Sequence, residues 1–411
     1  MPAFRSRQLT AFPSCERLTL RVTAMKLFVI GCLLCSVLLP LGTAQARTWY
    51  IKSDGTGDAP TIQAGLDSAQ VGDAVILEGG TYYEHDIVLK SGVLLTSATG
   101  LADGAVIDAK HDGRVMRGRD LSGDTRIVGI TLKNGWYPCV EDPWGGRPCF
   151  GGAMILGWSF VRISNCAFVD NIAAIGTGPE VGRGGGLYAE ECTLVLTDCV
   201  FSGNTAHDGG GAWCGASTVS MSGCRFYDNL GECGGGLYVG GCNAQMTGCV
   251  FARNQSLTVG AGLWVGGYAC TIENCTFSSN HAWMGMGAGI YSGHNGPTVS
   301  RTIIAFSTKG NAVTCSDPDD ITLECCDLYG NEGGDWVGEI EGQADVSGNF
   351  SLDPRFCAEE SDNLALMQCS PCAPGNHPNG WNCGLIGALS VGCPGTAGEE
   401  TTWSRIKTMF R

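Results

Sequence analysis

Hydrophobic and polar positions alternate with a period of two in short segments, and the same alternation returns about every 25 residues between 166 and 280. Each copy has a Cys two residues before a Phe and an Asn three residues after it. Alternate side chains of a strand point to one side, so Cys224 and Phe226 should face together. The Phe and Asn positions are Phe168/Asn171, Phe201/Asn204, Phe226/Asn229, Phe251/Asn254 and Phe277/Asn280. Such a regular period predicts stacked coils rather than one globular core.

Each copy also carries a glycine phrase, which lets the backbone turn with positive φ where a Cβ would clash. The Asn falls where the strand must turn, since Asn tolerates left-handed backbone and its amide can bond from coil to coil. The Phe side chains should stack in one internal ladder and the Cys side chains in another. The glycine phrases begin at Gly184, Gly209, Gly234, Gly260 and Gly287, and the predicted free thiols of the Cys ladder are Cys166, Cys199, Cys224, Cys249, Cys275 and Cys326.

This pattern predicts an all-β parallel solenoid with about 25 residues per coil. A β-propeller blade needs about 40 residues for its four strands, and a sandwich would not need so strict a period. A helical pattern at 61–69, with Ile62, Leu66 and Ala69 on one face, predicts a helix that caps the N-terminal end. The predicted parts are a signal peptide region at 1–46, a β-helix domain at 47–393 (N-terminal coils and cap 47–109, repeats 110–351, Cys-rich C-terminal cap 352–393), and a linker and tail at 394–411.

An export signal, the net charge and the cysteine content indicate where the protein is located and which partners it can bind. Met25-Lys26, an apolar run over 27–41 and Ala44-Gln45-Ala46 are typical of an export signal. Without 1–46 the chain has 20 basic and 39 acidic residues, a net charge of −19, which disfavours nucleic acid as a partner. No later apolar stretch predicts a membrane span. The remaining 20 cysteines, an even number, permit disulfides in an exported chain.

The repeats resemble known proteins. The glycine phrase with Phe-x-x-Asn resembles the repeat of chlamydial-type polymorphic outer membrane proteins. Residues 49–95 resemble the opening coil of right-handed parallel β-helix proteins of the pectin lyase-like superfamily, and 79–84 (Gly-Gly-Thr-Tyr-Tyr-Glu) is similar to the Gly-x-Tyr-x-Glu of pectinesterases. Over about 48–390, the resemblance implies right-handed coils with three sheets. The catalytic sequences of pectinesterases, pectate lyases and polygalacturonases are missing from the chain, so the resemblance carries the fold and not the chemistry.

Charged residues gather at the turns around the repeated Asn. Paired carboxylates beside a His or Arg can serve acid–base cleavage of a glycosidic bond, and the alternative is a solvated turn with an ion pair between Asp228 and Arg253. The candidate catalytic residues are Asp170, His207, Asp208, Asp228 and Glu232.

Two insertions interrupt the repeat, at 136–150 and after Asn171. Exposed aromatic rings can stack on sugar rings. The aromatic residues of the first insertion, and Arg183 next to the second insertion with its Glu180, are therefore candidates for glycan binding. The alternative is a loop that folds its aromatics onto the solenoid, closed by a disulfide between Cys139 and Cys149. The candidate glycan-binding residues are Trp136, Tyr137, Trp144, Arg183 and Trp283.

Cofactors are not expected, although the acidic stretch 316–320 leaves calcium open. Cys369 and Cys372, with Cys383 and Cys393, suit either a four-thiolate zinc site or disulfides in the cap, and export favours disulfides. We predict no metal site.

The preferred hypothesis is a secreted, monomeric, non-catalytic β-helix at the cell surface or outside the cell that binds a glycan or cell-envelope component. Its alternative is a polysaccharide-cleaving hydrolase or lyase.

Overall fold

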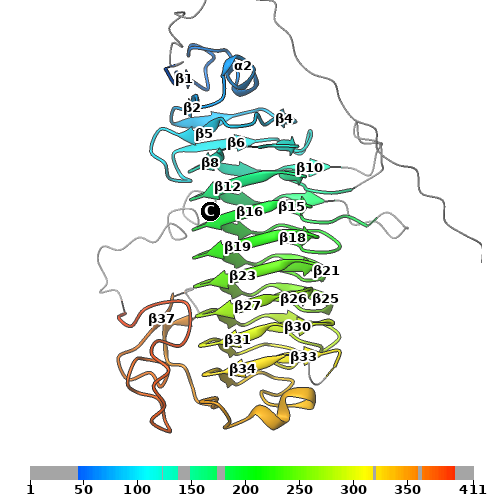
Figure 1. Cartoon of the computed structure of the whole chain (residues 1–411), viewed down its shortest axis with the longest axis vertical. Helices are drawn as coiled ribbons and strands as arrows, with labels where there is room; N and C mark the ends of the chain where they lie inside the picture. The colour runs from blue at the N-terminus through cyan, green and yellow to red at the C-terminus, as the bar shows by residue number, and fades with distance from the viewer. Residues whose placement is uncertain are drawn as a thin grey trace, which may run out of the picture. The chain divides into compact units, whose positions relative to one another are not determined.

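The computed structural model describes residues 45–122, 124–137, 149–173, 181–317, 321–359 and 363–393, and in these residues three long parallel sheets stack coil upon coil (Figure 1). Sheet A contains β1 (Thr48–Ile51), β2 (Ala74–Leu77), β5 (Leu94–Ser97), β8 (Thr125–Val128), β12 (Phe160–Ser164), β16 (Thr193–Thr197), β19 (Thr218–Ser222), β23 (Asn243–Thr247), β27 (Cys270–Glu273), β31 (Thr298–Ser300) and β34 (Thr322–Glu324). Sheet B contains β3 (Gly80–Tyr82), β6 (Ala105–Asp108), β9 (Thr131–Lys133), β13 (Ala167–Val169), β17 (Val200–Ser202), β20 (Arg225–Tyr227), β24 (Val250–Ala252), β28 (Thr276–Ser278), β32 (Ile303–Ala305) and β35 (Asp327–Tyr329).

Sheet C follows sheet B in each coil, after a short fourth run of strands, sheet D. Sheet C contains β4 (Ile87–Val88), β7 (Met116–Arg119), β11 (Met154–Gly157), β15 (Leu187–Glu190), β18 (Ala212–Gly215), β22 (Leu237–Gly240), β26 (Leu263–Gly266), β30 (Ile290–Ser292) and β33 (Val313–Cys315). In sheet D, β10 (Trp136–Tyr137) pairs with β14 (Ile172–Ala173), β21 (Leu230–Cys233) pairs with β25 (Gln255–Val259), and β25 pairs in turn with β29 (His281–Ala282). The predicted parallel solenoid is confirmed.

The repeated Phe and Cys side chains line the interior, as predicted. Phe201 stacks on Phe226 with ring centroids 4.7 Å apart, and Phe226 on Phe251 at 4.8 Å. This distance equals the spacing between neighbouring strands, so the backbone sets the stacking. All six cysteines of the predicted ladder are buried free thiols, which confirms that prediction. Burial raises the pKa of the Cys166 thiol, so this thiol stays neutral, and the buried cysteines of the ladder pack as small apolar groups.

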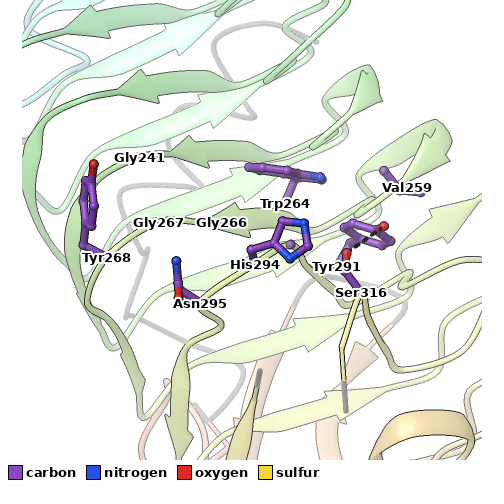
Figure 2. Close-up of a pocket in the computed structure, with 11 residues that line it drawn as sticks. Gly241, Val259, Trp264, Gly266, Gly267, Tyr268, Tyr291, His294, Asn295 and Ser316 are labelled. Atoms are coloured by element: carbon purple, nitrogen blue, oxygen red, sulfur yellow. Dashed lines mark hydrogen bonds between the residues drawn. The ribbon is translucent and has the colours of Figure 1, made fainter. Parts of the chain in front are cut away.

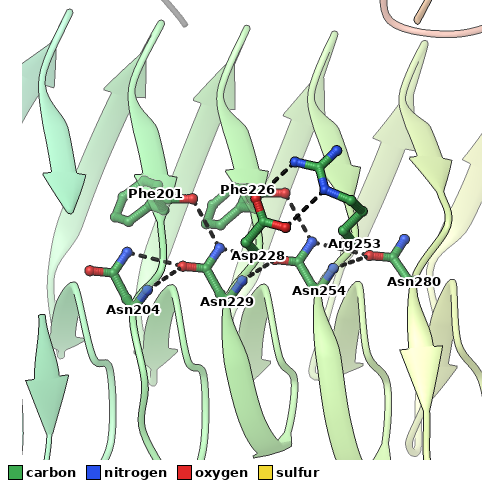
Figure 3. A network of polar contacts seen from close by, with 8 residues as sticks. All are labelled: Phe201, Asn204, Phe226, Asp228, Asn229, Arg253, Asn254 and Asn280. Carbon is green, nitrogen blue, oxygen red and sulfur yellow. Dashed lines mark hydrogen bonds and ion pairs between the residues drawn. The ribbon is translucent and has the colours of Figure 1, made fainter. Parts of the chain in front are cut away.

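The repeated Asn side chains form a buried hydrogen-bonded ladder (Figure 3). Asn229 Nδ2 donates to Asn254 Oδ1 at 2.9 Å and to the carbonyl of Phe201 at 2.9 Å, and the same pattern repeats in neighbouring coils. The expected left-handed backbone is not at the Asn, because the residue before it takes that conformation: φ is 55° at both Asp228 and Arg253. The Asn side chain is instead buried and hydrogen-bonded inside the coil.

The helix α2 (Ile62–Ser68) covers the N-terminal end of the stack, as predicted. The Thr61 hydroxyl accepts a hydrogen bond from Ala64 N at 3.1 Å, and the Glu84 carboxylate accepts one from Ile62 N at 2.9 Å. Ile62 and Leu66 are buried in the same core as the first strands. Glu84 belongs to the sequence that resembles pectinesterases, and here it caps a helix.

Two different segments finish the C-terminal end. The 3₁₀ helix η2 (Gly338–Gln343) inserts Ile340 into the core of the last coils. The Cys-rich segment packs on the outer face of sheet B, where Tyr227 and Ile303 share a buried cluster with Phe356. It contains the antiparallel pair β36 (Phe356–Ala358) and β37 (Asn363–Leu366), and it is fastened by the disulfides Cys325–Cys383 and Cys357–Cys393.

A buried acid in this cap predicts a pH-dependent stability. Burial raises the pKa of Asp327 to about 8, against about 3.9 in an unfolded chain. The folded state therefore binds the proton more tightly, so stability should fall as pH rises from about 4 to about 8. Asp327→Asn should remove this decline, as measured by urea unfolding midpoints across that range. The exposed control Asp345→Asn should retain it, and an unchanged decline in Asp327→Asn would disprove the assignment.

Candidate functional site

Four ionisable side chains from three successive coils meet where the chain enters sheet C: Arg183, His207, Asp208 and Glu232. His207 Nδ1 lies 2.9 Å from Asp208 Oδ1, and His207 Nε2 lies 2.8 Å from Glu232 Oε2. Arg183 Nε is 3.5 Å from Asp208 Oδ2. Isolated backbone bridges pair Arg183 with Asp208 and Asp208 with Cys233, which aligns the three coils. Both carboxylates are thus engaged by basic side chains.

The other two candidate carboxylates lie at a different corner, between sheets B and D. Arg253 donates from Nε and Nη2 to the two oxygens of Asp228, each at 2.8 Å (Figure 3). Asp170 Oδ2 is 3.9 Å from Lys133 Nζ, and partial burial raises the pKa of Asp170. The five candidate catalytic residues therefore divide into two groups. The bidentate pair agrees with the alternative of an ion-paired turn, and a catalytic role for any of the five stays a prediction.

The predicted glycan-binding residues do not form one platform. Trp136 is 38% exposed, whereas Tyr137 is buried and its ring lies 3.9 Å from the Arg114 guanidinium. Trp283 is half-exposed and makes an edge contact with His281, with ring centroids 4.5 Å apart. Five steps of strand pairing or bridging along sheet D separate Trp136 from His281, roughly 24 Å at the usual strand spacing.

Several of the predicted residues lie outside the described part of the chain: Trp144, Glu180 and Cys139. Cys149 is disulfide-bonded, and its predicted partner Cys139 is among the undescribed residues. Residues 318–320 of the acidic stretch are likewise not described. Within the described residues no group of three or more His, Cys, Asp or Glu side chains is placed to hold a metal ion.

A second aromatic ladder runs along the outer face of sheet C, and the sequence reasoning missed it. Phe150 stacks on Tyr188 at 4.5 Å, and Tyr188 stacks on Trp213 at 4.6 Å. The ladder continues from Trp213 to Tyr238 at 6.1 Å and from Tyr238 to Trp264 at 4.0 Å. The signal was an aromatic residue two positions after each glycine phrase, at a place where period-two alternation points outward.

Glycines two residues after the aromatics make room for these rings. A Cβ at Gly215 would lie 2.1 Å from the Trp213 ring, and one at Gly266 would lie 2.8 Å from the Trp264 ring. At the N-terminal end the Arg183 guanidinium covers the ladder, 5.0 Å from the Trp213 ring centroid. From Tyr188 onward the exposure of the rings rises, from 3% at Tyr188 and 7% at Trp213 to an intermediate level at Tyr238 and Trp264.

The ladder stops at Trp264, and an open hollow of about 520 Å³ lies there (Figure 2). Tyr291 pairs with Trp264 in the strand register, but no stacked contact between these two rings exists in the described structure. The Tyr291 hydroxyl instead lies 3.3 Å from Ser316 Oγ in the following coil. One face of the Trp264 indole packs on Tyr238, and the indole lines the hollow together with Tyr291 and His294. We call this place the Trp264 hollow.

Comparison with known proteins bears on the fold. Residues 147–304 match the family model described as right handed beta helix region. The fold is a right-handed parallel β-helix. The handedness that the resemblance implied is thus confirmed, whereas the likeness to chlamydial-type repeats stays a prediction. No curated protein matches this β-helix chain.

Solved structures resemble the β-helix at low identity. Pectate lyase Pel9A is 14% identical with a TM-score of 0.43, covering 85% of this chain and 98% of that one. Pectin methylesterase PemA from Erwinia chrysanthemi is 9% identical with a TM-score of 0.39, covering 83% and 98%. A pectin methylesterase from Aspergillus niger is 13% identical with a TM-score of 0.36, covering 78% and 94%. No activity in these names is transferred to this chain.

Proposed function

We propose that this chain is a secreted β-helix protein that binds a glycan in the Trp264 hollow and does not cleave it. The observation that carries the proposal is the end of the outer aromatic ladder, where the Trp264 indole borders an open hollow. Aromatic side chains with a few polar groups around them are typical of small-molecule sites. The apolar C–H face of a sugar ring suits the indole, and the sugar hydroxyls suit the polar rim.

The composition of the hollow supports a neutral sugar. Its rim offers hydrogen-bonding groups from His294, Asn295 and Ser316, and Tyr268 adds an aromatic ring that is 77% exposed. The residues that line it include no Asp, Glu, Lys or Arg. Because the chain carries a net charge of −15, an acidic polysaccharide would also be repelled at long range.

The carboxylates support binding without cleavage. Hydrolysis of a glycosidic bond generally needs two carboxyl groups that face the substrate with a fixed separation. Asp228 is held by Arg253, and Asp208 is held by Arg183 and His207. None of these residues lines the Trp264 hollow. The disulfides of the cap support an oxidising, extracellular setting. No helix in the described residues is long and apolar enough to cross a membrane.

A glycan array combined with a reducing-sugar release assay tests the proposal. We expect wild-type protein to bind neutral glycans and to release no reducing ends from them. Release that is lost in Glu232→Gln or Asp208→Asn would support the cleaving alternative instead. Absence of binding to every neutral and acidic glycan, without release, would contradict both functions.

Trp264→Ala should weaken binding of the best array ligand about tenfold or more, since loss of a stacking surface worth about 1.4 kcal/mol changes the affinity tenfold. Titration calorimetry measures the effect. The matched control is Trp158→Ala, which removes a 45% exposed indole that does not line the hollow. Equal affinities of wild type and Trp264→Ala would show that the ligand binds elsewhere.

A further inference from the structure

Two thiols of the C-terminal cap are left over after its disulfides form. Cys325 pairs with Cys383 and Cys357 with Cys393, while Cys369 and Cys372 stay free. The leftover pair has the spacing Cys-Ser-Pro-Cys. Cys369 is exposed and Cys372 is fully buried. An accessible first thiol and a buried second thiol are what a two-step thiol exchange requires, because the first must meet the reagent and the second must not.

The segment around these thiols is fixed by specific contacts. Ser370 Oγ donates to the Pro354 carbonyl at 2.6 Å and accepts from Cys372 N at 3.1 Å. Arg355 Nη1 donates to the Cys369 carbonyl at 3.2 Å, which holds the backbone of the exposed residue in place.

A buried carboxyl touches the second thiol. Cys372 Sγ donates to Asp327 Oδ2 at 3.1 Å, and Asp327 Oδ1 accepts from Leu352 N at 3.1 Å. Asp327 is fully buried and is the first residue of β35. Burial raises the pKa of the Cys372 thiol well above its ordinary value, so this thiol needs a base within reach before it can react. Asp327 is that base by position, and with a pKa of about 8 it is ionised in a growing share of the molecules as the pH approaches 8.

We propose that Cys369 and Cys372 form a redox-active dithiol that exchanges with an external disulfide, with Asp327 as the proton acceptor of Cys372. The site is independent of the Trp264 hollow. A buried acid packed against a buried thiol makes the fold less stable than an apolar pair in the same place would. Groups with such a cost concentrate at functional sites.

The exchange takes two steps. The Cys369 thiolate attacks one sulfur of an external disulfide, forms a mixed disulfide and releases the first external thiolate. Cys372 then loses its proton to the Asp327 carboxylate and attacks the Cys369 sulfur, which forms the Cys369–Cys372 disulfide and releases the second thiolate. The dithiol is oxidised by two electrons, and the external disulfide is reduced to two thiols.

The test is a timed exchange of the full, folded chain with glutathione disulfide, quenched by alkylation and read by mass spectrometry of the peptide that contains both cysteines. Wild-type protein should form the Cys369–Cys372 disulfide, and Cys372→Ser should stop at glutathione on Cys369. Asp327→Asn should leave the first step unchanged and slow the second on the order of 100-fold, the range of general-base contributions. The control Cys233→Ser removes the partly exposed thiol of β21 and should behave as wild type.

Two results would overturn the proposal or its parts. No internal disulfide in wild type, together with an unmodified Cys369 in Cys372→Ser, would refute the exchange site. Equal rates of the second step in wild type and Asp327→Asn would refute the role of Asp327. Where circular dichroism shows that Asp327→Asn does not fold, the Cys372→Ser result decides the exchange site alone.

Discussion

Replacing Phe226 by Asp is expected to abolish folding of the β-helix. Phe226 is fully buried and stacks on Phe201 and Phe251, so the change removes two ring contacts and places a carboxylate in the core. Loss of a buried Phe side chain costs about 3–5 kcal/mol, and an unpaired buried charge adds several kcal/mol more. Together these approach the whole stability of a typical domain, about 5–15 kcal/mol.

The readout for Phe226→Asp is soluble yield, far-ultraviolet circular dichroism and resistance to protease. Its control is Tyr83→Asp, which puts the same charge at a side chain that is 63% exposed and should fold normally. Soluble, protease-resistant Phe226→Asp protein would contradict the interior ladder.

Asn254→Ala is expected to destabilise the β-helix by about 3–6 kcal/mol, since each buried group left unpaired costs about 1–3 kcal/mol. Asn254 Oδ1 accepts from Asn229 N and Nδ2, and Asn254 Nδ2 donates to the Phe226 carbonyl and to Asn280 Oδ1. The substitution therefore removes four hydrogen bonds, so that Asn229 N loses its acceptor and the Phe226 carbonyl loses a donor, while Asn229 Nδ2 keeps its bond to Phe201 and Asn280 Oδ1 keeps its bond from the backbone N of residue 254.

Urea unfolding monitored by circular dichroism measures this loss. The control is Asn243→Ala, at an exposed position of β23, which should change stability by at most about 0.5 kcal/mol. A midpoint for Asn254→Ala that matches the control would show that the ladder contributes little.

Much of the fold could be predicted because the interior repeats. Phe226, Cys224 and Asn229 recur at a fixed spacing, and strand alternation alone assigns them to one face. The left-handed turn residue could not be placed, because Asp228, Arg253 and Ser279 differ in type although they share one conformation. Which residue takes the left-handed conformation depends on the hydrogen bonds that hold the following Asn side chain. Those bonds between coils are seen only in the structure.

The candidate site was only partly predictable. Neighbours in successive coils are fixed by the period, so the meeting of His207 with Glu232 followed from spacing, while the contact of the other His207 ring nitrogen with Asp208 depends on the side-chain conformation of His207. The outer ladder was visible in principle, because Tyr238 and Trp264 follow their glycine phrases at the same distance. The end of the ladder at Trp264 could not be predicted, because Tyr291 follows its glycine phrase at the same distance as the other aromatics. Only the contact of Tyr291 with Ser316 takes the Tyr291 ring out of the stack.

The central claim is that the ligand binds in the Trp264 hollow rather than at the inserted loops. Nuclear magnetic resonance of protein labelled with ¹⁵N at its ten tryptophan indoles tests this most directly, with signals assigned by Trp→Phe variants. On titration with the best array glycan, the Trp264 signal should shift most. Shifts confined to Trp136, Trp144 or Trp283, with the Trp264 signal unmoved, would contradict the account.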